Sequence, residues 1–274
     1  MKINELIDYG NKQIHKDKVK LLLSQILGYN PLELYNHLDE NVDIDKEETF
    51  KKVVEAVVNN TPIQYALGKT NFYGYEFVVN EKVLIPRFET EELVENTIKY
   101  IDKYFNGKAN IIDLGCGSGA IGISIKKERK ECNITLLDIS IDALEVAKEN
   151  SELLSTDVNI IQGDMLDSIE EKFDIIISNP PYIKEDEKID SLVKDNEPHL
   201  ALYAKDNGLY FYEKILAHAS NNLKDKYIIA FEIGADQAND IIDIAHKHLS
   251  DIKIIVKKDM QGRDRMLFVF KNCE

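Results

Sequence analysis

Residues 173–182 read Phe-Asp-Ile-Ile-Ile-Ser-Asn-Pro-Pro-Tyr, and the fold can be worked out from this stretch. Its apolar first part predicts a buried strand at Phe173–Ser178. The two prolines that follow cannot continue a helix or a strand ladder, and they keep the backbone extended as it leaves the sheet. Asn179 therefore follows the carboxyl end of a strand, which is where open α/β sheets bind their ligands.

The tetrapeptide Asn179-Pro180-Pro181-Tyr182 combines hydrogen-bond acceptors with a flat aromatic ring. The Asn179 side chain and the Pro180 carbonyl are acceptors, and proline has no N–H that would compete with them. Tyr182 adds a stacking surface close by. Such a group suits a planar substrate that carries an NH2 group. The alternative interpretation is a rigid exit from strand to loop, since Asn-Pro dipeptides commonly mark turns.

The composition describes a large, acidic, globular chain. Its 274 residues, 44% of them hydrophobic, suit one large domain or two ordinary ones. No apolar run is long enough to cross a membrane and no signal-peptide pattern opens the chain, so we expect a cytoplasmic protein without a membrane partner. The net charge of −15 disfavours direct binding to nucleic acid, because phosphate-binding domains are usually basic.

The cysteines and histidines do not suggest a metal site. Cys116, Cys132 and Cys273 are sparse and lack metal-ligand spacing, so we expect free thiols in a reducing compartment. His246 and His248 lie two residues apart on a predicted helix and so face different ways, which favours a solvated surface.

The chain is expected to divide into three parts. Residues 1–68 predict a small helical domain, with one helix at 16–27 that Gly28 and Pro31 end, and a second that Asp45 caps and that runs to Val58. This domain either docks a substrate or supports the core. Residues 69–84 predict a β-hairpin linker around Gly74, and residues 85–274 the catalytic domain.

From residue 110 onward the pattern alternates strand and helix, which is typical of a parallel α/β sheet. A further helix before it would start from a Thr90 cap and run to about Tyr104. The predicted helices are Ala120–Lys127, Ile141–Leu153, Gly208–Asn222 and Asp236–His248. The predicted strands are Ile111–Leu114, Ile134–Asp138, Val158–Ile161, Phe173–Ser178 and Tyr227–Ile233, followed by an antiparallel edge hairpin of Ile252–Val256 and Met266–Phe270.

A glycine-rich loop follows the first of these strands, at Asp113-Leu114-Gly115-Cys116-Gly117-Ser118-Gly119-Ala120. Its glycines allow a tight turn and a close approach to a ligand, and its N–H groups suit polar ligand groups. Asp138 ends the next strand, where an acid accepts bonds from ribose hydroxyls. A dinucleotide also fits this loop, as does a plain tight turn. Cys116 is interpreted as a small loop residue rather than a nucleophile.

The order of these motifs resembles the peptide chain release factor glutamine methyltransferase family, also called HemK-like. The resemblance rests on the helical N-terminal region, Ile85-Pro86-Arg87-Phe88-Glu89-Thr90-Glu91, the glycine loop and Asn179–Tyr182, and it covers nearly the whole chain. Glu197-Pro198 with Ala201-Leu202 and Phe231-Glu232-Ile233-Gly234 also match the family pattern. It implies a seven-stranded Rossmann-like methyltransferase sheet with a small helical N-terminal domain, S-adenosylmethionine as methyl donor and S-adenosylhomocysteine as product.

The resemblance also implies roles for individual residues. Cofactor contacts are expected from Asp113, Gly115, Cys116, Gly117, Ser118, Gly119, Asp138, Asp164, Met165 and Asn179. Asp113 commonly supports the methionine end in such enzymes, and Gly163-Asp164-Met165 stands where adenine is contacted, although family members often have an aromatic residue at the position of Met165. Catalysis falls to Asn179, Pro180 and Tyr182, and substrate binding to these three together with Pro181.

The implied reaction methylates the side-chain amide of the glutamine in the Gly-Gly-Gln motif of class I release factors. We expect the Asn179 side-chain oxygen and the Pro180 carbonyl to accept the two amide N–H bonds. The alternatives are a ribosomal-protein glutamine methyltransferase, an adenine-N6 methyltransferase acting on nucleic acid, and a module that binds the cofactor without turnover. The chain is expected to act as a monomer.

Overall fold

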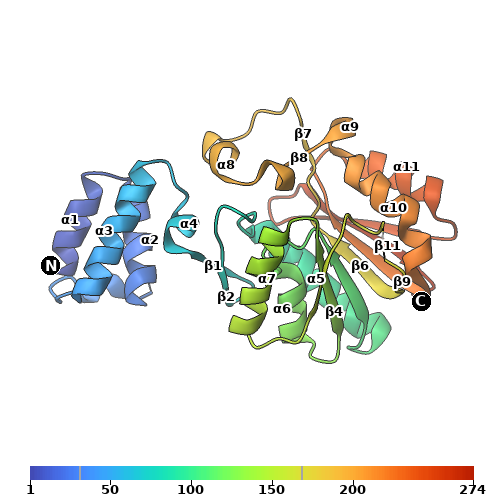
Figure 1. The fold of residues 1–274 in the computed structure, drawn as a ribbon, viewed down its shortest axis with the longest axis horizontal. Helices are drawn as coiled ribbons and strands as arrows, with labels where there is room; N and C mark the ends of the chain where they lie inside the picture. Colours follow the sequence, from blue (N-terminus) through green and yellow to red (C-terminus); the bar gives the residue numbers. More distant parts are fainter. Residues whose placement is uncertain (31, 168) are drawn as a thin grey trace. The chain divides into compact units, whose positions relative to one another are not determined.

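The computed structural model describes residues 1–30, 32–167 and 169–274 (Figure 1). These residues form two compact units. The first consists of Met1–Gly68 together with Asp190–Asn196, and the second of Lys69–Ile189 and Glu197–Glu274. Pro31, which was expected to help end a helix, lies outside the described residues. Among the described residues, no helix is both long enough and apolar enough to cross a membrane.

The first unit is made of helices around its own apolar core. Its elements are α1 (Ile3–Asn11), α2 (Lys16–Leu27), the 3-10 turn η1 (Glu33–Asn36), α3 (Ile44–Val58), α4 (Ile63–Leu67) and α8 (Ser191–Asn196). Both helices predicted here are confirmed, and Gly28 ends α2 in the left-handed conformation. Asp45 does not cap α3, because the helix begins one residue earlier and Asp45 lies in its first turn.

The second unit is built on a seven-stranded sheet whose order is β10-β11-β9-β6-β3-β4-β5. Its strands are β3 (Asn110–Leu114), β4 (Asn133–Asp138), β5 (Asn159–Gln162), β6 (Phe173–Ser178), β9 (Leu223–Glu232), β10 (Lys253–Lys258) and β11 (Asp264–Lys271). All neighbours are parallel except those of β11, which runs antiparallel to both β9 and β10. The predicted sheet and its closing hairpin are confirmed.

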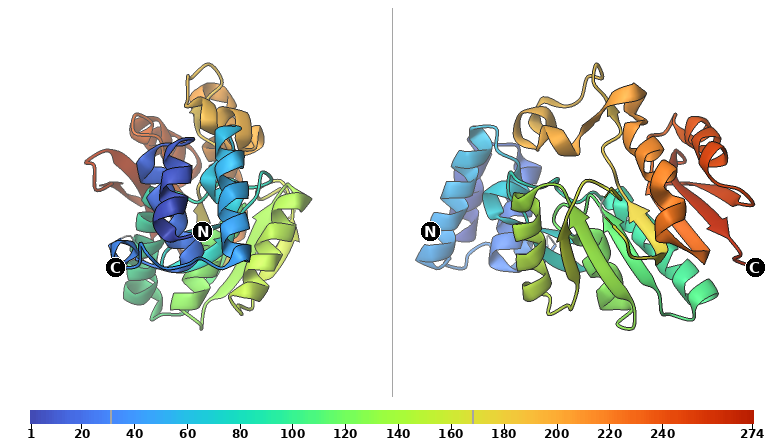
Figure 2. Two further views of the ribbon diagram at one scale, coloured as in Figure 1. Left: turned by 90° about the vertical axis from the view of Figure 1, so that its left-hand side faces the viewer. Right: turned by 45° about the vertical axis from the view of Figure 1, so that its right-hand side comes forward.

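Helices cover both faces of this sheet (Figure 2). Alternate residues of β3 point to opposite sides, so Ile111 packs in one cluster and Ile112 in the other. One face is covered by α5 (Phe88–Phe105), α6 (Ala120–Glu128) and α7 (Ile141–Leu153). The opposite face is covered by α10 (Tyr210–Asn222) and α11 (Ala238–His248), after the short turn α9 (Lys205–Gly208).

Two local predictions are wrong in this unit. Thr90 does not cap α5, because the helix begins at Phe88 after an extended Arg87, and the Thr90 hydroxyl donates instead to Glu232. His248 is not a plain solvated side chain, since its Nε2 atom lies 2.7 Å from Glu213 Oε1. His246 is exposed as expected. Cys116, Cys132 and Cys273 are free thiols, as predicted.

The predicted hairpin around Gly74 is confirmed as β1 (Lys69–Phe72) and β2 (Tyr75–Val78). It belongs to the same compact unit as the sheet. The buried Asn150 side chain on α7 holds it there, accepting from Val78 N at 2.6 Å and donating to Val78 O at 3.0 Å. Asn150 Nδ2 also donates to Ser118 O at 2.9 Å, so one side chain joins the hairpin to the glycine loop.

Three further short elements lie between β6 and α9 in this unit. The short strands β7 (Ile183–Lys184) and β8 (Tyr203–Ala204) pair in parallel, and the 3-10 turn η2 (His199–Ala201) precedes β8. The backbone that leaves the sheet at Asn179 therefore enters a second, two-stranded sheet a few residues later. The sequence pattern did not predict this pairing.

Candidate active site

A cavity of about 290 Å³ opens at the carboxyl ends of β3, β4, β5 and β6. Of the residues predicted to form the site, Gly115, Gly117, Asp138, Asp164, Met165, Asn179 and Pro181 line it. Asp113, Cys116, Ser118, Gly119, Pro180 and Tyr182 are not among its lining residues. The cavity therefore joins the glycine loop to the end of β6, as the parallel topology requires.

Three N–H groups of the glycine loop donate to residues at the end of the neighbouring strand β4. Gly115 N and Cys116 N both donate to Leu137 O, at 2.8 and 3.0 Å. Gly117 N donates to Asp138 Oδ2 at 2.9 Å. This differs from the expectation that the loop offers these N–H groups to a ligand. What the loop offers is space, because Gly115 and Gly117 have positive φ angles, and at Gly117 an added Cβ would meet no atom within 4 Å.

Asp138 joins the loop to β4 and faces the cavity. Its Oδ2 accepts from Gly117 N and its Oδ1 from Ser140 N, both at 2.9 Å. Burial raises the pKa of Asp138, and these backbone donors counteract part of that effect. Each carboxylate oxygen retains a further lone pair, so Asp138 can still accept hydrogen bonds from a ligand hydroxyl.

Asp113 is the most constrained carboxyl group in this region. It is fully buried, and Oδ2 accepts from Gly122 N at 3.0 Å while Oδ1 has no partner among the described residues. Burial raises its pKa to about 7, with the nearby Asp138 charge as a smaller contribution. Burial raises the pKa of the Cys116 thiol, and the neighbouring Asp113 and Asp138 add to that effect, which favours the neutral thiol.

The far end of the cavity is formed by Asp164 and Met165 after β5. Asp164 pairs with Lys214 at 2.7 Å, and Lys214 also pairs with Asp167 at 2.8 Å. Met165 adopts a positive φ of 52° and is almost fully buried. Its methyl carbon would lie 3.9 Å from a Cβ added at Gly115, so the end of the Met165 side chain lies close to the glycine loop.

Asn179 follows β6 and lines the opposite part of the cavity. Its Nδ2 donates to Thr90 Oγ1 at 3.2 Å, and the Thr90 hydroxyl donates to Glu232 Oε2 at 2.6 Å. Tyr182 Oη lies 3.5 Å from the other Glu232 oxygen. Burial raises the pKa of Tyr182, so its hydroxyl keeps its proton.

Glu232 is the centre of this polar group and was matched in the sequence only as part of a family pattern. It is 2% exposed at the end of β9, and burial raises its pKa to about 7. Ser178 on β6 pairs with Phe231 on β9 in parallel register. The residues that follow them, Asn179 and Glu232, therefore lie beside each other at the same edge of the sheet. The register of the sheet therefore brings them together across residues far apart in the sequence.

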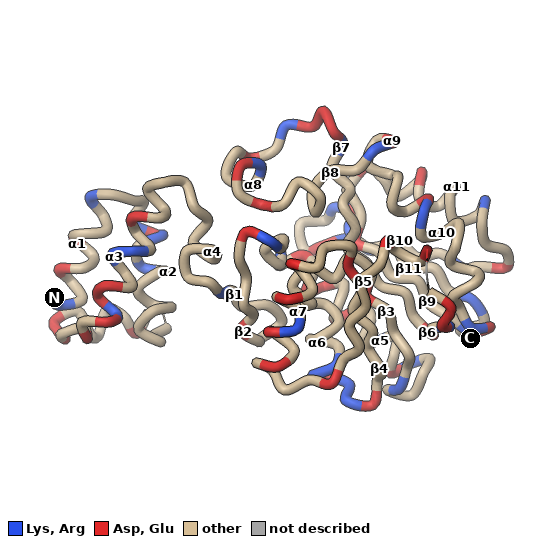
Figure 3. Tube along the Cα trace, in the orientation of Figure 1, with Lys and Arg blue, Asp and Glu red and all other residues tan. Residues whose placement is uncertain are grey.

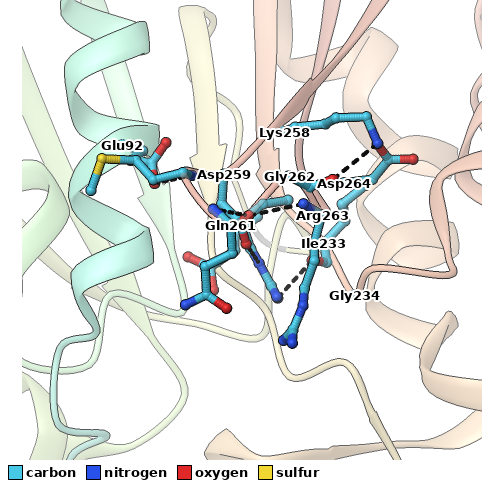
Figure 4. A network of polar contacts seen from close by, with 12 residues as sticks. Glu92, Ile233, Gly234, Lys258, Asp259, Gln261, Gly262, Arg263 and Asp264 are labelled. Carbon is cyan, nitrogen blue, oxygen red and sulfur yellow. Dashed lines mark hydrogen bonds and ion pairs between the residues drawn. The ribbon is translucent and has the colours of Figure 1, made fainter.

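Arg265 on β11 completes the polar group. Its Nη1 donates to Ile233 O at 3.2 Å and lies 3.5 Å from Tyr182 Oη, and its Nε lies 3.4 Å from Asp259 Oδ2. Asp259 in turn closes the β10–β11 turn by accepting from Gln261 N and Arg263 N, both at 2.9 Å (Figure 4). This turn is also joined to α5, because Met260 N donates to Glu92 at 3.1 Å.

An ion pair between the half-exposed Arg87 and the buried Glu197 holds the segment before α5. Arg87 Nη2 lies 2.6 Å from Glu197 Oε1, and Ile85 N donates to Glu197 Oε2 at 3.2 Å. Glu197 precedes the cavity residues Pro198, Leu200 and Ala201. Together with Tyr210 and Phe211, these residues line the cavity without having been predicted to do so. The family pattern at Glu197-Pro198 and Ala201-Leu202 was a sequence signal for Pro198 and Ala201, whereas Tyr210 and Phe211 had none in the motifs considered.

Three features define the class of protein as a Rossmann-like α/β methyltransferase. They are the glycine loop after β3, Asp138 at the end of β4, and the cavity at the carboxyl ends of these strands. The family model described as the methyltransferase small domain matches residues 90–201, and that of the PrmC N-terminal domain matches residues 10–68. A solved methyltransferase from Pyrococcus furiosus superposes with a TM-score of 0.55 at 18% identity, over 80% of this chain and 98% of that one, which supports the fold.

Relatives narrow the class to one family. The chain is 37% identical over 255 residues to a release factor glutamine methyltransferase from Bacillus anthracis, covering 91% of this chain and 90% of the relative. It is 38% identical over 259 residues to the protein of that name from Bacillus subtilis, covering 92% and 90%. The chain belongs to the release factor glutamine methyltransferase family.

Proposed function

We propose that this protein transfers a methyl group from S-adenosylmethionine to the side-chain nitrogen of the glutamine in the Gly-Gly-Gln motif of class I release factors. The observation that carries the proposal is one cavity lined by both Asp138 with its glycine loop and Asn179 with Pro181. Relatives at 37% and 38% identity named for this activity support the substrate. We further propose that the protein works in the cytoplasm as a monomer.

The residues present fit S-adenosylmethionine. Asp138 would suit the ribose hydroxyls. Asp113 Oδ1 has no partner among the described residues and would suit the ammonium group of the methionine end, which requires the ligand to reach a buried carboxyl group that does not line the cavity. The open space beside Gly117 would admit the ligand, with Asp164 and Met165 at the adenine end. Gly119 has a structural role instead, because a Cβ there would lie 2.8 Å from Ile123 Cδ1. When bound, the cofactor supplies an activated methyl group on a sulfonium.

The difficult partner in the reaction is the amide nitrogen, whose lone pair is delocalised. The rotation barrier of a peptide bond, about 18–20 kcal/mol, shows the strength of that conjugation. In the proposed mechanism Asn179 Oδ1 and the Pro180 carbonyl accept the two N–H bonds of the glutamine amide. They would fix the nitrogen for in-line attack and stabilise the positive charge that develops on it. Tyr182 would pack against the amide plane.

The helical unit is proposed to dock the protein substrate. Among its described residues, large apolar side chains stand exposed at Leu21, Leu32, Tyr35, Ile44 and Val58. Such groups are suited to contact a folded protein rather than a phosphate backbone. In addition, Lys and Arg positions are scattered along the chain among Asp and Glu (Figure 3), which supports a protein substrate over a nucleic acid.

Incubation with labelled S-adenosylmethionine tests the proposed function. The candidate substrates are a class I release factor, its variant with the Gly-Gly-Gln glutamine changed to asparagine, total ribosomal protein and an adenine-containing oligonucleotide. We expect label only on the intact release factor, mapped to that glutamine by mass spectrometry. Label on a ribosomal protein or on adenine, with none on the release factor, would replace the proposed substrate.

A further inference from the structure

The hydroxyl of Thr90 lies between Asn179 and Glu232 and is 4% exposed. A hydroxyl has one proton to donate and two lone pairs that accept. At 2.6 Å from a carboxylate oxygen, the Thr90 proton is donated to Glu232. The same oxygen atom can therefore meet Asn179 only as an acceptor.

This has a consequence for the Asn179 side chain. An amide presents an NH2 group on one side and an oxygen on the other, and the two can exchange places by rotation. Because Thr90 Oγ1 can only accept, Nδ2 must face it, as it does at 3.2 Å. Oδ1 then points away from Thr90, which leaves it able to face the cavity that Asn179 lines.

We propose that Thr90 and Glu232 are positioning residues that fix the orientation of the Asn179 amide, so that its oxygen rather than its NH2 group faces the substrate. The proposal rests on the proposed function, because an NH2 group in the substrate is what requires an oxygen there. Neither residue touches the reacting atoms. Both act only through Asn179, whose side-chain oxygen is proposed to contact the substrate amide.

The protonation of Glu232 decides whether this arrangement holds. The groups that face it are Thr90 and Glu89 from α5, Tyr182 after β6, Arg265 from β11 and Tyr212 from α10, whose hydroxyl donates to Glu232 O at 2.8 Å. Burial raises the pKa of Glu232 to about 7, Glu89 adds to that effect, and Arg265 opposes it. A protonated Glu232 could donate to Thr90, whose own proton would then turn toward Asn179.

The backbone next to Glu232 is held by the neighbouring strand β11. Arg265 is joined to Ile233 O and to Asp259, and Asp259 closes the turn between β10 and β11 (Figure 4). Ile233 N also donates to Arg265 O at 2.9 Å, so the residue after Glu232 is bonded in both directions. The position of Glu232 therefore depends on the whole C-terminal hairpin.

Three substitutions test the proposal in the full-length enzyme. Thr90→Val removes the hydroxyl with little change of shape, and Glu232→Gln replaces the carboxylate with a group that can donate to Thr90. Both should lower kcat for the release factor about tenfold, with the affinity for S-adenosylmethionine changed less than twofold. Thr90→Ser keeps the hydroxyl and should stay within threefold of wild type.

Thr97→Val is the matched control. Thr97 lies on the same helix, is fully buried, and its hydroxyl has no hydrogen-bond partner among the described residues. The same change there should leave kcat unaltered, so a loss confined to position 90 reports on the bond to Asn179. Wild-type-like kcat in both Thr90→Val and Glu232→Gln would overturn the proposal.

A measurement on the free enzyme separates this proposal from the proposed function. The side-chain NH2 signals of Asn179, assigned in ¹⁵N-labelled protein by their absence in Asn179→Asp, should shift with pH with a midpoint near 7, the pKa of Glu232. That shift should vanish in Glu232→Gln and in Thr90→Val. Signals that do not move between pH 5.5 and 8.5 in wild type would refute the positioning role, even if methyl transfer is confirmed. If the shift is seen without transfer to glutamine, only the proposed function fails.

Discussion

The two ends of the cavity are built by different means. At the glycine loop, backbone N–H groups bond to Leu137 O and Asp138, within two adjacent strands, and the ligand space arises where side chains are missing. At Asn179, side chains from α5, β9 and β11 converge in a buried polar group. The first arrangement needs only two neighbouring strands, whereas the second needs α5 and strands from the other half of the sheet. The two ends should therefore fail separately when mutated.

The largest effect is expected at the Asn179 end. Asn179→Ala removes the acceptor proposed for the substrate N–H and should lower kcat by about 10²–10³, by analogy with loss of one oxyanion-hole donor. Affinity for S-adenosylmethionine should change little. Single-turnover kinetics with calorimetric titration of the cofactor measure both quantities. Near-wild-type turnover would remove Asn179 from the mechanism.

The converse pattern is expected at the glycine-loop end. Asp138→Ala removes a ligand acceptor and the partner of Gly117 N, and should weaken S-adenosylmethionine binding by about 1–3 kcal/mol. At saturating cofactor, kcat should recover to within a few-fold of wild type. Tight binding of NAD with none of S-adenosylmethionine would overturn the cofactor proposal, and a kcat loss equal to that of Asn179→Ala would abolish the distinction between the two ends.

A pH-dependent effect on folding stability is also expected at the glycine-loop end. The pKa of Asp113 is raised from 3.8 to about 7, so the folded state retains a proton that the unfolded chain has lost. This group's contribution is full below about pH 4 and is lost as pH rises to 7, at roughly 1.4 kcal/mol per pH unit. Asp113→Asn should remove that slope. Urea unfolding at pH 5.5 and 6.5 compares the two proteins, and equal slopes would contradict the assignment.

The smallest effect is expected from a surface substitution, which serves as the control for both ends of the cavity. Lys99 and Glu95 form an exposed pair one turn apart on α5, with 2.6 Å between Nζ and Oε1. Lys99→Ala should cost only about 0.3–0.5 kcal/mol of folding stability and leave kcat and cofactor affinity unchanged. Urea unfolding and the same kinetic assays test this. A loss of turnover here would mean that α5 transmits surface changes to Thr90.

The same difference between the two ends explains which features could be predicted from the sequence. The strands, the glycine loop and the exit after β6 follow from short patterns, and each lies within one or a few residues of its predicted bounds. Glu232 and Thr90 are 142 residues apart, and only strand register and helix packing bring them to 2.6 Å. A short sequence pattern around either residue therefore cannot predict that the two side chains are in contact.

The errors at helix starts have a similar origin. Thr90 and Asp45 are residues that favour capping, yet α5 and α3 begin earlier than either. At α5 the chain arrives extended at Arg87, whose side chain is held by Glu197, so the first turn is already set at Phe88. A capping preference of about 1 kcal/mol is too small to set a helix start against the contacts of the segment before it, here the pair of the half-exposed Arg87 with the buried Glu197.

The antiparallel position of β11 has a consequence for the order of events during synthesis. Asp264–Lys271 lies inside the sheet, between β9 and β10, yet it is made after every other strand. The helical segments of residues 1–68 can form as the chain leaves the ribosome. One edge of β9 stays unpaired and apolar until β11 has been synthesised. A nascent or truncated chain that stops before residue 264 would expose that edge to its neighbours, so premature stops here should produce aggregates rather than a slightly weakened enzyme.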